Sequence, residues 1–227
     1  MSSPPRGVFL SLSALTIATG LVDAASVLGM GVFAANMTGN IVFLGFSLGG
    51  APGYSVIAAL FALAGFLVGA FVAGLVVVGK FESRRAGQAL GVESAVLVAA
   101  ALAAWLTGAD GLDGWPDWVV LAVLGAAMGL QNAISLKSGV TDMRTTVLTL
   151  TLTALASDLA RGKNDQAGIR IYSVVLLLVG ALGGTLLLFW AGLTWTIAAA
   201  ALFVGIAAIL IARTRSAALG ATAGGGG

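Results

Sequence analysis

The stretch GLVDAASVLGMGVFAANMTGN, residues 20–40, decides how this chain must fold. It begins inside a long apolar run, yet it carries a carboxylate at Asp23 and the polar cluster Asn-Met-Thr-Gly-Asn at 36–40. Water solvates such groups cheaply, whereas hydrocarbon does not. A segment with both properties is expected to line a cavity or to pack against other protein inside a membrane.

The composition of the whole chain identifies its medium. Of 227 residues, 59% are hydrophobic and only 9% are charged, and the mean hydropathy is +1.06. About a quarter of the residues of a typical soluble domain are charged. Too little charge remains here to cover a water-facing surface. The chain is therefore predicted to be an all-α integral membrane protein whose main partner is the lipid bilayer.

Eight apolar stretches follow one another along the chain. Six of them are near the length of about 20 residues that a helix needs to cross roughly 30 Å of hydrocarbon. The second and the sixth have only 13 and 15 residues, so as helices they would reach about 20 and 23 Å. The stretches are 7–30, 37–49, 54–79, 90–107, 118–136, 146–160, 171–192 and 194–212.

The basic residues distinguish six crossings from eight. If all eight stretches crossed, starting from the cytoplasm, the basic segment 80–85 would lie outside, against the positive-inside rule. If the two short stretches enter and return on the same side, all eleven basic residues lie inside and the acidic segment 110–117 lies outside. We therefore predict six transmembrane helices, two short re-entrant helices and cytoplasmic termini. The alternative is that 146–160 is a true, slightly short span.

The two halves of the chain resemble each other. GLVDAAS at 20–26 corresponds to GLQNAIS at 129–135. YSVIAALFALAGFLVGAFVAGL at 54–75 corresponds to YSVVLLLVGALGGTLLLFWAGL at 172–193. The two matches occur in the same order, and in each half they flank a short stretch. They indicate an internal repeat.

The number of crossings fixes the orientation of the repeats. Each half has three, an odd number, so the second half must enter the membrane with the opposite orientation. We predict two inverted three-span repeats, at about 7–107 and 117–212, within a single transmembrane domain at 1–215. Such repeats recur in transporters, with solute sites near the membrane midplane. Residues 216–227 are expected to form a disordered tail.

The two short helices define the predicted site. If each runs from the middle of the membrane to its own surface, both N-terminal ends, with unpaired N–H groups, face the centre. Such ends suit an anionic or other polar solute. Asn36 or Thr38 is expected to cap the first helix, and Asp142 or Thr145 the second. The candidate solute-binding residues are Asp23, Asn36, Thr38, Asn40, Gln131, Asn132, Asp142, Arg144, Thr145, Thr146 and Thr149.

Asp23 has two interpretations. An intramembrane carboxylate is a functional-site hypothesis by default, so Asp23 either titrates and carries protons or accepts hydrogen bonds that pin the next segment. The repeat aligns it with Asn132, which cannot titrate, and this favours the pin. We expect its carboxylate to accept hydrogen bonds from residues 31–40.

Further polar and glycine patterns have structural interpretations. We expect Glu93 to be solvated or to be a first-turn helix charge, and Asp158 to form an interfacial ion pair with Arg161. Thr149 and Thr153 either face a polar path or bond their own backbone carbonyls. Glycines four residues apart should allow close helix packing; these are Gly65, Gly69, Gly125 and Gly129.

Two motifs also carry a resemblance. GLVDAASVLGMGVFAANMTGN at 20–40, with GLQNAISLKSGVTDMRTTVLTLTLT at 129–153, resembles the YoaK-like family of bacterial inner-membrane proteins of unknown function. The sequence departs from the family at Leu150, where the family often has glycine. The resemblance implies about six spans and a location in the bacterial cytoplasmic membrane. It implies no substrate.

These observations predict a transporter or channel for a small solute, with a central site formed by the two short helices. The alternative is a non-transporting membrane scaffold or assembly factor. An enzyme is not expected, because a chain without histidine cannot build a Ser–His pair or an HExxH zinc site. We expect no cofactor, metal or nucleic acid, and a homo-oligomer is left open.

Overall fold

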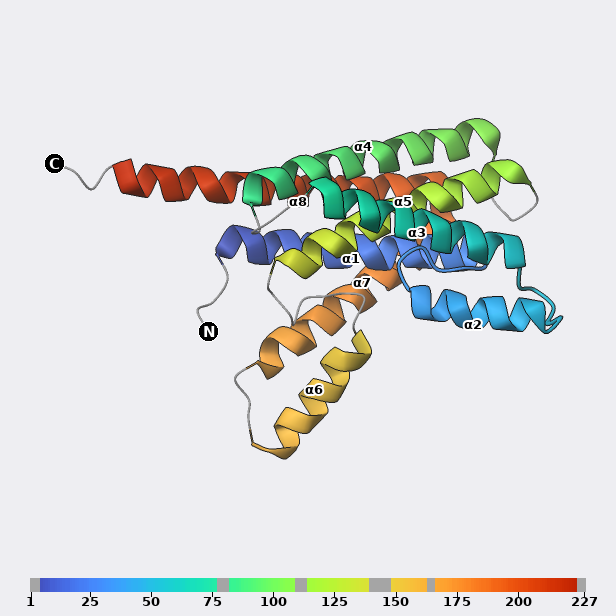
Figure 1. Cartoon of the computed structure of the whole chain (residues 1–227), viewed down its shortest axis with the longest axis horizontal. Coiled ribbons are helices and arrows are strands. Elements are labelled where there is room, and N and C mark those ends of the chain that lie inside the picture. The colour runs from blue at the N-terminus through green and yellow to red at the C-terminus, as the bar shows by residue number, and fades with distance from the viewer. Residues whose placement is uncertain (1–4, 77–81, 109–113, 139–147, 163–165, 224–227) are drawn as a thin grey trace.

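The computed structural model describes residues 5–76, 82–108, 114–138, 148–162 and 166–223. Eight α-helices follow one another in these residues (Figure 1). They are α1 (Arg6–Met30), α2 (Met37–Leu48), α3 (Val56–Val76), α4 (Ser83–Thr107), α5 (Trp115–Lys137), α6 (Leu148–Ala160), α7 (Ala167–Ala191) and α8 (Leu193–Ala223).

Six of the described helices are long and apolar enough to cross a membrane, namely α1, α3, α4, α5, α7 and α8. The helices α2 and α6 have 12 and 13 residues, so their axes are only about 18 and 20 Å long. The prediction of an all-α membrane protein with six long apolar helices is confirmed. Whether α2 and α6 are re-entrant stays a prediction.

The long helices lie side by side along the long axis of the molecule, and α7 runs obliquely to the others (Figure 1). α1 packs against α7 and α8, α4 packs against α8 and α5, and α3 packs against α5. The buried core is formed mainly by α1, α4, α5 and α8, with the alanines of α3 packed on it. In this view α2 and α6 lie on the same flank of the bundle.

Small residues bring α3 and α5 into close contact. A Cβ atom at Gly69 would collide with the backbone of Ala126, and one at Gly129 would collide with the backbone of Phe66. Gly65 and Gly125 also face backbone of the opposite helix. Backbones that approach this closely replace hydrophobic driving force with van der Waals packing. The prediction of close packing at these four glycines is confirmed.

The crossing of α1 and α7 uses glycine in the same way. A Cβ atom at Gly20 would meet the backbone of α7, and one at Gly180 would meet the backbone of Ile17. Gly184 faces Leu21, whereas Gly183 faces open space. Repeat alignment from sequence pairs Gly65 with residue 183, but the packed glycines of α7 are its neighbours on either side.

Two helix ends differ from the sequence-based boundaries. α4 begins at Ser83 and not near residue 90, so the basic residues at its start are part of the helix. Long basic side chains tolerate this because they can extend their charges to the membrane surface. α8 continues to Ala223, which differs from the disordered tail expected from residue 216; its alanine-rich end favours helix.

Candidate functional site

A cavity of about 440 Å³ lies where α1, the segment 31–36 and the first turns of α2 and α6 meet. α7 contributes one side of it through Leu177. The lining residues are Thr19, Asp23, Ala35, Asn36, Thr38, Gly39, Val42, Phe43, Leu148, Thr149 and Leu177. Residues far apart in the sequence therefore share one partly polar hollow.

The cavity depends on the sharp turn at the end of α1. Gly31 adopts a left-handed backbone conformation with φ 69°, and its N–H donates to the carbonyl of Val27 at 3.0 Å. Glycine adopts this conformation without the steric cost that other residues meet. The hydroxyl of Ser26 then accepts from the N–H of Ala34 at 3.0 Å. These contacts fold residues 31–36 back along the helix end.

Asp23 holds this returning segment. Its Oδ1 accepts from the N–H of Ala35 at 2.8 Å, and the amides of Ala34 and Asn36 also face the carboxyl group. The expectation that Asp23 accepts hydrogen bonds from residues 31–40 is confirmed. The side chain is only partly buried because it also forms part of the cavity wall. Asp23 therefore combines a structural contact with access to the cavity.

Asn40 holds the same segment from the other side. Its Oδ1 accepts from the N–H of Phe33 at 2.8 Å, and its Nδ2 donates to the carbonyl of Phe33 at 2.6 Å. The residue is fully buried and is not part of the cavity lining. Its amide is used to clasp the backbone. The structure brings it near the site without exposing it to the cavity.

The first turn of α2 faces the cavity. The Oδ1 of Asn36 accepts from the N–H of Gly39 at 3.3 Å, so Asn36 is the N-cap, as one of the two expected candidates. Thr38 lies within the helix, is exposed and lines the cavity. A helix N-terminal end carries partial positive charge and spare N–H groups. The cavity therefore contains hydrogen-bond donors as well as the carboxylate of Asp23.

Gln131 stands behind the wall of the cavity. Its Nε2 donates to the hydroxyl of Thr19 at 2.8 Å and to the carbonyl of Leu15 at 3.3 Å. Its Oε1 is buried without a hydrogen-bond partner among the residues that the structure describes. Asn132 is partly buried and is not a lining residue. Of these two predicted residues, only Gln131 is joined to the cavity, and the link runs through Thr19.

The second half contributes the start of α6. Leu148 and Thr149 line the cavity, and the hydroxyl of Thr153 donates to the carbonyl of Thr149 at 2.8 Å. Thr153 therefore bonds its own helix, which is one of the two roles expected for it. The remaining predicted site residues lie outside the described residues and stay predictions: Asp142, Arg144, Thr145 and Thr146.

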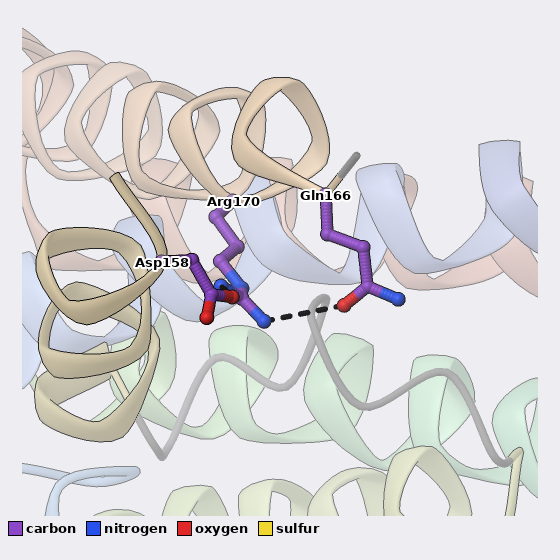
Figure 2. Close-up of polar contacts among 3 residues, drawn as sticks. All are labelled: Asp158, Gln166 and Arg170. Carbon is purple, nitrogen blue, oxygen red and sulfur yellow. Dashed lines mark hydrogen bonds and ion pairs between the residues drawn. The ribbon is translucent and has the colours of Figure 1, made fainter. Parts of the chain in front are cut away.

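An ion pair ties the far end of α6 to α7 (Figure 2). The Nη1 of Arg170 lies 2.6 Å from Oδ2 of Asp158, and Nη2 of Arg170 donates to Oε1 of Gln166 at 3.2 Å. Asp158 was expected to pair with Arg161; that residue instead donates its backbone N–H to the carbonyl of Asp158 at 3.1 Å. Arg170 is only 8% exposed. Sequence spacing favoured a local partner, whereas the helix hairpin supplies a distant one.

Sequence reasoning missed three features. Thr19 lies one helical turn before Asp23, and this spacing was a usable signal for a lining residue. Leu177 and Phe43 are apolar residues in apolar helices and give no signal. Glu93 was expected to be solvated or in a first turn. That expectation is wrong, because α4 starts ten residues earlier and Glu93 is only 1% exposed.

Comparison with known proteins gives the family. The family described as "Protein of unknown function (DUF1275)" matches residues 11–210. The UPF0700 transmembrane protein YoaK of Bacillus subtilis (strain 168) is 35% identical over 160 residues, which cover 68% of each chain. No solved structure matches this chain. With its six long apolar helices and a bacterial transmembrane relative, the chain is a multi-pass membrane protein and belongs to the YoaK-like DUF1275 family of unknown function.

Proposed function

We propose that this protein is a transporter or channel for a small polar solute, and that the cavity is its solute site. One observation carries the proposal: Thr38 of α2, Thr149 of α6 and Asp23 of α1 line the same hollow. The two short helices thus present their N-terminal turns to a common space. Its volume of about 440 Å³ lies in the range of ligand pockets, roughly 300–1,000 Å³.

The packing of the helices supports an inverted repeat. Exchanging α1–α4 for α5–α8 converts the contact of α1 with α7 into that of α5 with α3. It converts α1 with α8 into α5 with α4, α2 with α3 into α6 with α7, and α3 with α4 into α7 with α8. The contacts of α1 with α5 and of α4 with α8 convert into themselves. A two-fold relation between the halves accounts for this, and transporters use such a relation for alternating access.

Equivalent close contacts support the same relation. Gly180 and Gly184 of α7 approach Ile17 and Leu21 of α1. In the other pair, Ala62 and Phe66 of α3 approach Gly125 and Gly129 of α5. The sequence alignment of the halves places these contacts at nearly equivalent positions. The small residue changes helix between the two pairs, but the place of closest approach is kept.

The lining favours a neutral or donor-rich solute over a simple anion. It contains one carboxylate, one amide and three threonine hydroxyls, and no basic side chain among the described residues. The helix ends attract electron-rich groups, whereas Asp23 attracts donors. A molecule with both donor and acceptor groups satisfies both. The lack of histidine anywhere in the chain supports a role without catalysis.

A second candidate, a non-transporting scaffold, is supported by a specific observation. Asp23, Asn36 and Asn40 each accept a backbone N–H of the segment or helix start beside them. A protein that only needed a rigid turn inside the membrane would use polar residues in the same way. The two candidates differ in whether the cavity binds a solute.

Solute flux in liposomes tests the proposal. Purified protein is assayed with a panel of small anions, amino acids and nucleobases, alongside Thr38→Val and Thr149→Val. Each variant removes one hydroxyl from the cavity, at a cost of about 1 kcal/mol, so affinity for the solute should fall roughly fivefold. Thr185→Val is the matched control, because its hydroxyl bonds the carbonyl of Ala181 away from the cavity. A folded protein without flux or binding for the whole panel would favour the scaffold.

A further inference from the structure

Glu93 lies deep in the helix bundle, apart from the cavity. It follows Ser83 by ten residues, so it is about 15 Å along the axis of α4 from its start. It is 1% exposed and belongs to the buried face of α4, with Leu90 and Leu97 on either side along the helix. It is not among the residues that line the cavity. No role described so far uses it.

The neighbours of Glu93 come from helices that pack against α4. The hydroxyl of Ser94 donates to the carbonyl of Ala201 at 2.8 Å, while a Cβ atom at Gly87 would meet Ala208. α4 and α8 are therefore antiparallel, and Glu93 is level with residues 201–208 of α8. α5 covers another part of the same face. Both are apolar at this depth.

The described charges on these helices are at their ends. Arg84 and Arg85 occupy the first turn of α4, Asp117 and Lys137 the two ends of α5, and Arg213 the distal part of α8. α3, which touches α4 lightly, carries no charged residue in Val56–Val76. Among the described residues, neither carboxyl oxygen of Glu93 has a hydrogen-bond partner. The ends of these helices therefore leave Glu93 without a counter-charge.

A lone carboxylate in this position is energetically excluded. Burying an unpaired charge in a medium of low dielectric constant costs so much that the group takes up a proton instead. A protonated carboxyl group is neutral and can donate to a carbonyl of its own helix, as Thr16 and Thr19 do on α1. Glutamine, which has nearly the same shape and no charge, would satisfy a purely structural requirement equally well.

We propose that Glu93 is a proton-binding site in the core of the bundle, separate from the cavity. Its side chain is a carboxylic acid in this conformation, and it exchanges one proton with water when the contact of α4 with α8 or α5 opens. Ionisation leaves a carboxylate on Glu93 and transfers the proton to water. The closed packing then becomes unfavourable until the proton returns. This gives the protein a means to couple proton uptake to helix movement, whether or not the cavity binds a solute.

Infrared spectroscopy of the full-length protein in lipid nanodiscs tests the site, because it separates the C=O stretch of a carboxylic acid from that of a carboxylate. At neutral pH the wild-type spectrum should contain an acid component that is lost in Glu93→Gln. Glu82→Gln is the matched control on the same helix, because Glu82 is surface-exposed and pairs with Arg85 at 3.1 Å. The component should remain in that variant. It should also shift when water is replaced by deuterium oxide.

A second measurement needs no variant. An apolar carbodiimide reacts with protonated carboxyl groups inside membranes, and mass spectrometry should find the adduct on Glu93 and not on Glu82. This result, or the loss of the acid component in Glu93→Gln, supports the site. An acid component that survives in folded Glu93→Gln, or that does not shift in deuterium oxide, overturns the proposal. A wild-type protein without either the component or the adduct overturns it as well.

Discussion

Two side chains hold the turn between α1 and α2, and they do so with different chemistry. Asp23 gives one acceptor to the N–H of Ala35, whereas Asn40 both accepts from and donates to Phe33. Backbone groups that are not paired within helices must find such partners inside a membrane. The polar residues of the opening stretch are therefore required by the turn itself. Solute binding adds a second use for the one that faces the cavity.

Substitution of Asp23 separates its structural role from a titrating one. Asp23→Asn keeps an acceptor for the N–H of Ala35 and should fold with nearly unchanged stability. Asp23→Ala leaves that N–H unpaired and should lower the free energy of unfolding by about 1–3 kcal/mol. Thermal unfolding in detergent measures both. If well-folded Asp23→Asn loses a pH-dependent transport that the wild type shows, the carboxylate carries protons and the structural interpretation is incomplete.

Asn40 should matter more for stability than Asn36, although both are in the same polar cluster. Asn40→Ala removes partners from the N–H and the carbonyl of Phe33 in a buried place, which should cost about 2–4 kcal/mol. Asn36→Ala removes an exposed N-cap and should cost about 1 kcal/mol. Chemical or thermal denaturation of the two variants gives the comparison. Equal losses would show that burial of Asn40 is not the decisive factor.

The sequence predicted the residues whose chemistry conflicts with a membrane, and it failed where a remote partner decides. Asp23 and Asn36 stand out because polar groups interrupt an apolar stretch, and the structure gives both hydrogen bonds near the cavity. Arg170 was not singled out, because its partner Asp158 is on the other helix of a hairpin. Glu93 was misjudged because its burial depends on α8 and α5, which no local pattern reveals.

At the level of helix pairs, α3 and α5 depend on glycine. A methyl group at Gly69 would collide with the backbone of Ala126, so Gly69→Ala should force the helices apart and lower stability by about 1–3 kcal/mol. Gly74→Ala is the matched control on the same helix, because nothing lies within 4 Å of a Cβ atom there. It should be neutral or stabilise by up to about 1 kcal/mol. Similar stability of the two variants would contradict the packing described here.

The ion pair of α6 with α7 should control the position of α6. Arg170→Gln removes a buried partner of Asp158 and should increase hydrogen exchange across Leu148–Ala160, with a stability loss of about 1–3 kcal/mol. Arg85→Gln breaks an exposed pair with Glu82, whose side chains are 52% and 41% exposed, and should cost less than about 1 kcal/mol. Unchanged exchange in α6 would show that other contacts hold it. Because Thr149 at its other end lines the cavity, solute affinity should change as well.

Helix positions were well predicted because apolar length is a strong signal, and helix ends were predicted less well. α1 and α2 end within a residue of the sequence-based limits. The start of α4 was missed because Arg84 and Arg85 were taken as loop residues, although helix propensity favours arginine. The repeat was detected from two short matches. The contact of the two halves through glycines at shifted positions depends on packing and was not detectable.

The whole molecule places its basic ends together. A Cβ atom at Gly7 of α1 would meet Thr214 of α8, and one at Gly87 of α4 would meet Ala212. The starts of α1 and α4 therefore lie at the same end of the bundle as the distal part of α8. This end carries Arg6, Arg84, Arg85 and Arg213. A shared basic end is what the positive-inside rule requires of a cytoplasmic face.

Cysteine labelling in intact cells tests the orientation of the molecule, and the native chain offers no background because it has no cysteine. With six crossings and cytoplasmic termini, Ser83→Cys and Gly168→Cys should be protected from an impermeant maleimide, whereas Thr107→Cys should react. Eight crossings would reverse the result at residues 83 and 107, because α2 would then change the side of every later segment up to α6. Permeabilised cells provide the control, since both protected positions should react there. Labelling of residue 83 from outside would show that α2 crosses the membrane, and the cavity between two returning helix ends would lose its basis.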